Sequence, residues 1–117
     1  MISYTRKIVW LILLLTPIHF SSVNHTRPNF CNVYGIAYQV SDPHRADFHV
    51  YEEETEGSAD ILIYETEDKL FADRSGLWHF TDVEAFADFK VYFGNNRGTA
   101  DFTVYFIDVE SFAGCNR

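Results

Sequence analysis

The stretch Ala100-Asp101-Phe102-Thr103-Val104-Tyr105-Phe106-Ile107-Asp108-Val109-Glu110-Ser111-Phe112 is the clearest copy of a short unit that recurs along the chain. Thirteen-residue copies also begin at Ala46, Ala59 and Ala87, a fifteen-residue copy begins at Ala72, and a weaker first copy begins at Val33. Self-similarity at a fixed period indicates an architecture built from one repeated structural unit.

The first half of each unit alternates between two sets of side chains, as an extended strand requires. Phe102, Val104 and Phe106 fall on one face, because side chains two residues apart share a face of a strand. Aromatic and β-branched residues at this spacing favour strand. The same register predicts a core face that continues with Phe48, Val50, Ile61, Ile63, Trp78, Phe80, Phe89, Val91 and Phe93.

The second half of each unit predicts a single helical turn at a bend. Asp82 and Asp108 open two of these segments, and a small acid is able to cap freed backbone N–H groups there. Phe71, Phe86 and Phe112 end their units. We expect these three rings to plug the gaps at the bends.

Two all-β arrangements stack such units. A parallel solenoid would place successive copies about 4.8 Å apart. It would bring together the like charges of a repeated acid, which is destabilising, and a parallel crossover usually takes a dozen or more residues. We therefore predict an antiparallel meander or curled sheet with single helical turns at the bends, and keep a β-solenoid as the alternative. The acid recurs at Asp47, Asp60, Asp73, Asp88 and Asp101.

The amino-terminal residues predict export. Residues 1–22 resemble a secretory signal peptide, with Arg6 and Lys7 before the apolar run 8–15. That run is shorter than the ~20 residues that span a bilayer; an uncleaved anchor is the competing interpretation. Residues 23–32 form a lead-in and 33–115 the repeat domain, so we expect a secreted or otherwise exported protein. Asn24 lies in a weak N-glycosylation triplet.

Cys31 and Cys115 bracket the repeats, and export would place them in an oxidising compartment. We predict a disulfide between them. Free or metal-bound thiols are the alternative, but two cysteines without a nearby His pair make a poor zinc site.

Composition limits the function classes. The chain has 117 residues, 47% of them hydrophobic, and a net charge of -8. These values allow one domain with a packed core. An acidic surface argues against nucleic acid, and against an anionic membrane after signal removal, because both need clustered Lys and Arg.

One position of the repeat carries an aromatic column on the face opposite the predicted core. Tyr offers a flat apolar body with a polar tip, so the column is a candidate platform for a sugar ring or a peptide. The alternative is a second packing layer beneath the helical turns. The column comprises Tyr38, Tyr51, Tyr64, His79, Tyr92 and Tyr105.

No catalytic residue, metal site or cofactor is predicted. The acidic runs 52–56 and 65–68 lack EF-hand spacing, so solvated bends explain them more simply than calcium binding. The repeated Asp is present too often to be one catalytic pair. We find no Ser-His-Asp order, Gly-rich phosphate loop or metal-spaced His set in the sequence.

The units Ala59-Asp60-Ile61-Leu62-Ile63-Tyr64, Ala87-Asp88-Phe89-Lys90-Val91-Tyr92 and Ala100-Asp101-Phe102-Thr103-Val104-Tyr105, with Gly76-Leu77-Trp78-His79-Phe80 midway, support a resemblance. The chain resembles a family of small, mostly bacterial proteins of unknown function built from Ala-Asp-x-x-Val-Tyr repeats. The similarity covers residues 33 to 114 and implies no mechanism. The leader and the two cysteines look like additions that suggest an exported version.

These patterns together predict a secreted, non-enzymatic structural or interaction module. One alternative is a carbohydrate- or peptide-binding module that uses an exposed Tyr column. Another is a small hydrolase or a cation-binding factor.

Overall fold

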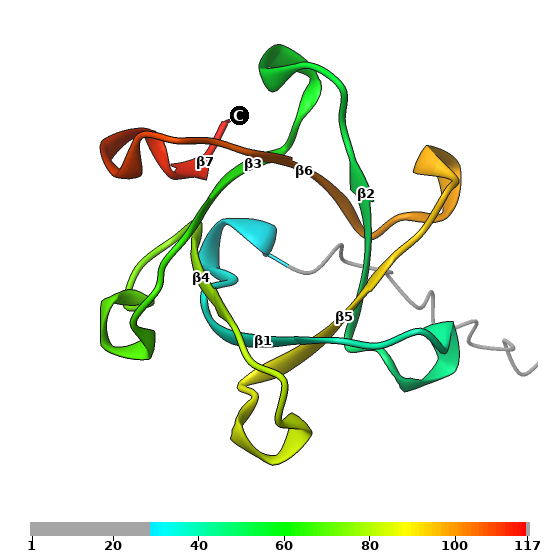
Figure 1. Ribbon diagram of the computed structural model, residues 1–117. Coiled ribbons are helices and arrows are strands. Elements are labelled where there is room, and N and C mark those ends of the chain that lie inside the picture. Colours follow the sequence, from blue (N-terminus) through cyan, green and yellow to red (C-terminus); the bar gives the residue numbers. More distant parts are fainter. Residues whose placement is uncertain (1–28, 117) are drawn as a thin grey trace, which may run out of the picture.

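The computed structural model describes residues 29–116, and its strands alternate with short 3₁₀ turns (Figure 1). The predicted signal peptide and Asn24 lie outside the described residues. The strands are β1 (Gly35–Gln39), β2 (Phe48–Glu52), β3 (Ile61–Glu65), β4 (Leu77–Phe80), β5 (Phe89–Phe93), β6 (Phe102–Phe106) and β7 (Gly114–Cys115). The turns are η1 (Phe30–Asn32), η2 (Pro43–Arg45), η3 (Glu56–Ser58), η4 (Lys69–Phe71), η5 (Glu84–Phe86), η6 (Arg97–Thr99) and η7 (Glu110–Phe112).

Strands β1 to β6 form a closed parallel barrel. The order around it is β4-β1-β5-β2-β6-β3, and β3 pairs with β4 to complete the ring. β1, β2 and β3 occupy alternate places, and β4, β5 and β6 fill the places between them. The chain therefore passes around the barrel axis twice, with the second winding interleaved into the first (Figure 1).

The predicted antiparallel meander is wrong, although the all-β class agrees with the structure. All pairings within the ring are parallel, and only β7 runs antiparallel to its partner, β3. Short connections predict a meander because they normally join antiparallel neighbours. Here β1 and β2 do not pair; a strand of the second winding lies between them. We call the segment around each 3₁₀ turn between two strands a lobe. A short lobe therefore suffices as a connection, because it carries the chain onward around the axis rather than back along an adjacent strand.

The register between neighbouring strands has a regular stagger. The first residue of β5, Phe89, pairs with the third residue of β1, Ala37. The same offset recurs where Phe48 pairs with Val91, Phe102 with Val50 and Ile61 with Val104. Closing a sheet into a barrel requires tilted strands and a fixed stagger. The repeated offset tilts the strands so that they curve around the barrel axis (Figure 1).

The repeated Asp fixes this stagger. The Asp101 backbone N–H donates to the His49 carbonyl at 2.6 Å, and the His49 N–H donates to Asp101 Oδ2 at 2.7 Å. One residue, through its backbone N–H and its carboxylate, thus joins the start of β6 to the second residue of β2 at two points, an arrangement that we call the Asp clamp. The same reciprocal pair joins Asp47 to Lys90, Asp60 to Thr103 and Asp88 to Ile36.

The barrel interior is filled by the predicted core face. The third residue of five strands is fully buried, as is Trp78 of β4. Burying a Val, Ile or Phe side chain contributes about 1.5–3 kcal/mol, and the Trp78 indole Nε1–H donates to the Val33 carbonyl at 3.0 Å. All twelve predicted core residues lie in this cluster or pack against it, which confirms the period-two prediction.

The amino end of the barrel is closed. Phe30 of η1 lies with its ring centroid 5.8 Å from that of Phe102, the first residue of β6. Cys31 is disulfide-bonded to Cys115 of β7, as predicted, across 84 residues of chain. β7 pairs with the first two residues of β3, whereas the last two residues of β3 pair with β4. The amino-terminal segment and β7 are thereby tied together across this end.

The fifteen-residue unit that begins at Ala72 allows β7 to lie close against the barrel. Gly76 has a φ of +80°, and a Cβ added there would lie 2.3 Å from the Gly114 nitrogen. Only glycine adopts this conformation without strain and permits so close a backbone approach. The two extra residues of the unit from Ala72 therefore coincide with the place where three strands meet.

The expectation for Phe71, Phe86 and Phe112 is wrong. Their exposed fractions are 61%, 66% and 65%. Side chains of the strands already fill the interior of the barrel. The lobes project outward from the barrel (Figure 1), so the three phenyl rings have no gap to fill.

The Asp clamp predicts a selective loss of stability. Asp101→Ala leaves the part-buried His49 N–H without its acceptor, so the free energy of unfolding should fall by about 1–2 kcal/mol. The matched control is Asp108→Ala, which removes an exposed carboxylate and should change stability by about 0.5 kcal/mol or less. Urea unfolding measures both. An equal loss in the two variants would contradict the clamp.

The closed amino end predicts a second effect. Replacing Cys31 and Cys115 together by Ser frees a loop of more than 80 residues, so the free energy of unfolding should fall by about 4 kcal/mol in the chain-entropy model. Urea unfolding of the double variant against the oxidised protein tests this. Equal midpoints would show that the disulfide adds nothing to stability.

Candidate functional site at the carboxyl end of the barrel

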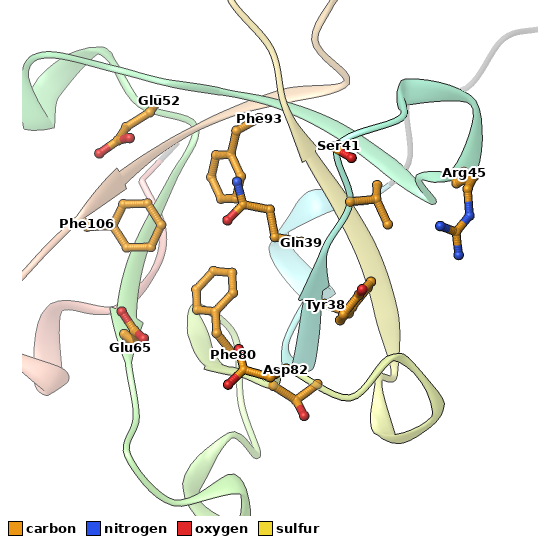
Figure 2. Close-up of a pocket in the computed structure, with 12 residues that line it drawn as sticks. Tyr38, Gln39, Ser41, Arg45, Glu52, Glu65, Phe80, Asp82, Phe93 and Phe106 are labelled. Carbon is orange, nitrogen blue, oxygen red and sulfur yellow. The ribbon is translucent and has the colours of Figure 1, made fainter.

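The carboxyl end of the barrel, unlike the amino end, is open. In parallel-strand proteins this end of the sheet is where ligand sites usually form. A cavity of about 880 Å³ lies there (Figure 2). We call it the mouth.

The last residues of the six strands alternate in chemistry around the mouth. β4, β5 and β6 end in Phe80, Phe93 and Phe106, whereas β1, β2 and β3 end in Gln39, Glu52 and Glu65. Because the two windings interleave, each Phe lies between two polar strand ends in the barrel order. The alternation follows directly from the double winding, since one winding supplies the aromatic residues and the other supplies the polar ones.

The three phenylalanines form a triangle at the base of the mouth. Their ring centroids are 6.3 Å apart for Phe80 and Phe93, 6.2 Å for Phe80 and Phe106, and 6.2 Å for Phe93 and Phe106. All three pairs are tilted, and each ring is only half-buried. Figure 2 shows the rings pointing toward one another at the centre of the mouth. An apolar aromatic base therefore remains open to a ligand.

The rim of the mouth is acidic. Glu52 and Glu65 are exposed strand ends on one side, and exposed Asp82 follows β4 (Figure 2). Arg45 lines the outer part, but its guanidinium is bonded to Glu84, which also lies 3.3 Å from Lys90 Nζ. The hydrogen bond to Arg45 lowers the pKa of Glu84, and the same bond raises the pKa of Arg45. Arg45 is thus already paired, and the rim carboxylates set the charge of the mouth.

The predicted Tyr column lies on the outside of the barrel, distributed over all six strands. Each of its members is half-buried. Tyr51 lies beneath the guanidinium of Arg97 at 5.8 Å, and Tyr92 lies edge-on to His49 at 5.5 Å. The structure places these side chains around the ring rather than on one flat surface, and Tyr38 alone of the column lines the mouth. Their role in binding stays a prediction.

Two strand histidines and a member of the acidic run have structural partners. His79 Nδ1 contacts the Thr66 carbonyl at 2.8 Å, and His49 Nε2 contacts the Pro43 carbonyl at 2.7 Å. Glu53 is buried and paired with Arg97, so the acidic run is not a uniform solvated bend. Within residues 29–116, no three His, Cys, Asp or Glu side chains are placed to hold a metal ion.

Sequence reasoning missed the mouth. It assigned Phe80, Phe93 and Phe106 to the core and Glu52 and Glu65 to acidic bends, because strand partners were unknown. A usable signal was present: the strand position that carries Phe in later units carries Gln39, Glu52 and Glu65 in earlier ones. Period-two alternation points all six residues to the same interior.

In residues 29–116, no helix has the length and apolar character needed to cross a bilayer.

Comparison with known proteins identifies the family. Searches against curated proteins and against solved structures gave no match. Residues 30–116 match the family model described as the 7(1) septoil knot domain. This match gives no support to a family built from Ala-Asp-x-x-Val-Tyr repeats. A knotted path agrees with a chain that passes twice around one axis, each strand of the second winding lying between two strands of the first. The chain therefore belongs to the septoil knot domain family.

Proposed function

We propose that this domain is a secreted, non-enzymatic binding module whose mouth binds an organic cation bearing apolar groups. The observation that supports the proposal is the alternation of three half-buried phenylalanines with polar strand ends, two of them carboxylates, at the open end of the barrel. The disulfide between Cys31 and Cys115 supports the exported location, because such bonds persist in oxidising compartments.

The aromatic base suits a cation because the face of an aromatic ring attracts positive charge. A cation within about 6 Å of a ring centroid gains about 0.5–1 kcal/mol at an exposed site and about 2 kcal/mol when desolvated. Phe80, Phe93 and Phe106 have mutual centroid separations of 6.2–6.3 Å, so one small cationic group is able to approach all three. Methyl or methylene groups on the cation would also bury apolar surface there.

The acidic rim adds selectivity for charge. Glu52 and Glu65 end neighbouring members of the same winding and lie on either side of Phe106 in the barrel order. Their carboxylates attract cations and repel anions. A neutral ligand of the same shape would keep the apolar contacts and lose both the carboxylate and the ring attraction.

Choline and its neutral isostere 3,3-dimethyl-1-butanol form a matched pair of probes. We expect choline to perturb the backbone amide resonances of Gln39, Glu52 and Glu65 with a Kd of about 1 mM, as suits a small ligand at an open site. The isostere should bind at least about tenfold more weakly, which corresponds to the loss of ~1.4 kcal/mol of charge interactions. NMR titration of the isotope-labelled protein measures both.

Two pairs of variants distinguish the effect of the rim carboxylates from the effect of the overall charge of the protein. Glu52→Gln with Glu65→Gln should weaken choline binding about tenfold and leave the weak binding of the isostere unchanged. The control pair, Glu54→Gln with Glu67→Gln, makes the same charge change at exposed residues that do not line the mouth. Equal binding of the two probes, equal effects of the two variant pairs, or no choline-dependent shift at the mouth would each overturn the proposal.

A further inference from the structure

The lobes that surround the barrel differ sharply in exposed apolar side chains. Leu70 and Phe71 of η4 are 73% and 61% exposed, and Phe86 of η5 and Phe112 of η7 are 66% and 65% exposed. Val83 and Val109, the residues that precede η5 and η7, are 45% and 48% exposed. Among the described residues, Tyr34 is the only other exposed large hydrophobic. We call the six lobe residues Leu70, Phe71, Val83, Phe86, Val109 and Phe112 the apolar arc.

The three apolar lobes are neighbours. Figure 1 shows η5, η4 and η7 in succession around one side of the ring. The side chain of Arg74, which follows η4, donates to the carbonyl of Glu110 at the start of η7 at 3.3 Å, so these two lobes are in direct contact. Three lobes that are far apart in the sequence therefore lie on one side of the molecule (Figure 1).

The fold does not require apolar residues at these positions. The other three lobes, η2, η3 and η6, end in Arg45, Ser58 and Thr99 at the place where η4, η5 and η7 end in Phe. Polar side chains thus satisfy the same local structure on the opposite side of the ring. Exposed apolar patches with a polar border mark interaction sites, and fold stability gives no reason for the three rings.

The border of the apolar arc is predominantly acidic. Asp108 and Glu110 flank Val109, Asp82 and Glu84 flank Val83, and Asp68 precedes η4. The cations on this side are Lys69, Arg74, which bonds to η7, and Arg45 and Lys90, which both pair with Glu84. In the described part of the chain, the carboxylates of Asp68, Asp82, Asp108 and Glu110 have no ion pair with these cations. A second copy of this chain would bring acid against acid across the interface, which is unfavourable. A partner with basic residues around apolar ones complements the arc.

We propose that the apolar arc docks a basic amphipathic segment of another protein. Apolar side chains of the segment contact the three phenylalanines, and its Lys or Arg side chains meet the acidic border. This surface is separate from the mouth: of the arc and its acidic border, only Asp82 lines the mouth. Binding at the two places is therefore testable independently.

The probes are two amphipathic peptides of the same length, one of Leu and Lys and the other of Leu and Glu in the same order. We expect the labelled Leu/Lys peptide to bind the full domain in fluorescence anisotropy and the Leu/Glu peptide not to bind. The variant Phe71→Ser, Phe86→Ser and Phe112→Ser, which copies Ser58 of η3, should weaken binding at least about tenfold. Near-UV circular dichroism should show that it stays folded, because the three rings are mostly exposed.

A matched pair of charge variants excludes nonspecific attraction to an acidic protein. Asp108→Asn with Glu110→Gln should weaken binding of the Leu/Lys peptide, whereas Glu54→Gln with Glu56→Gln in the segment of η3, which carries no residue of the apolar arc, should not. Equal effects of the two pairs, binding that survives the triple Ser variant, or no binding of the Leu/Lys peptide would each overturn the proposal. So would an arc-dependent dimer in light scattering, or arc-dependent binding to phosphatidylcholine vesicles, because either would identify a different occupant.

Discussion

The two-point bond between a repeated aspartate and the neighbouring strand underlies the rest of this structure. Asp101 receives the His49 N–H on its carboxylate and donates its own N–H to the His49 carbonyl. A one-residue slip would break both bonds and turn the side chains of the strand away from the core. Four such clamps fix the stagger between the two windings. The four acids of these clamps do not stack as like charges, because the barrel places them on different strands and each accepts from a backbone N–H of its neighbour.

The double winding gives the two ends of the barrel different roles. The amino end holds the clamps, the aromatic plug of Phe30 and the disulfide, so it is closed. The carboxyl end presents Phe80, Phe93 and Phe106 between polar strand ends. A rigid barrel with one closed end suits binding, because the side chains at the open end are positioned before a ligand arrives. The lobes are free of core packing, so their sequences are less constrained: η4, η5 and η7 end in Phe, whereas η2, η3 and η6 end in Arg45, Ser58 and Thr99.

Much of the local structure was predictable, and the topology was not. Alternation in Phe102, Val104 and Phe106 identifies a strand and its buried face, because burial acts on each side chain separately. It carries no information on which strand lies beside it. The choice of neighbouring strand depends on whether a short lobe leads to an adjacent strand or skips one place in the sheet. Both paths give the same alternation of apolar and polar residues along each strand. The mouth was missed for the same reason: Glu52 and Glu65 meet Phe106 only when the windings interleave. Phe112 is exposed although its side chain is apolar, because the filled barrel leaves no gap for it.

The most direct test of the double winding is to measure scalar couplings across backbone hydrogen bonds by NMR. The interleaved barrel predicts couplings from the amide of Val40 to the carbonyl of Val91, from Gly94 to Val50, and from Ile107 to Ile63, each linking one winding to the other. Couplings that instead join residues 35–39 directly to residues 48–52, as neighbours in a meander, would contradict the account.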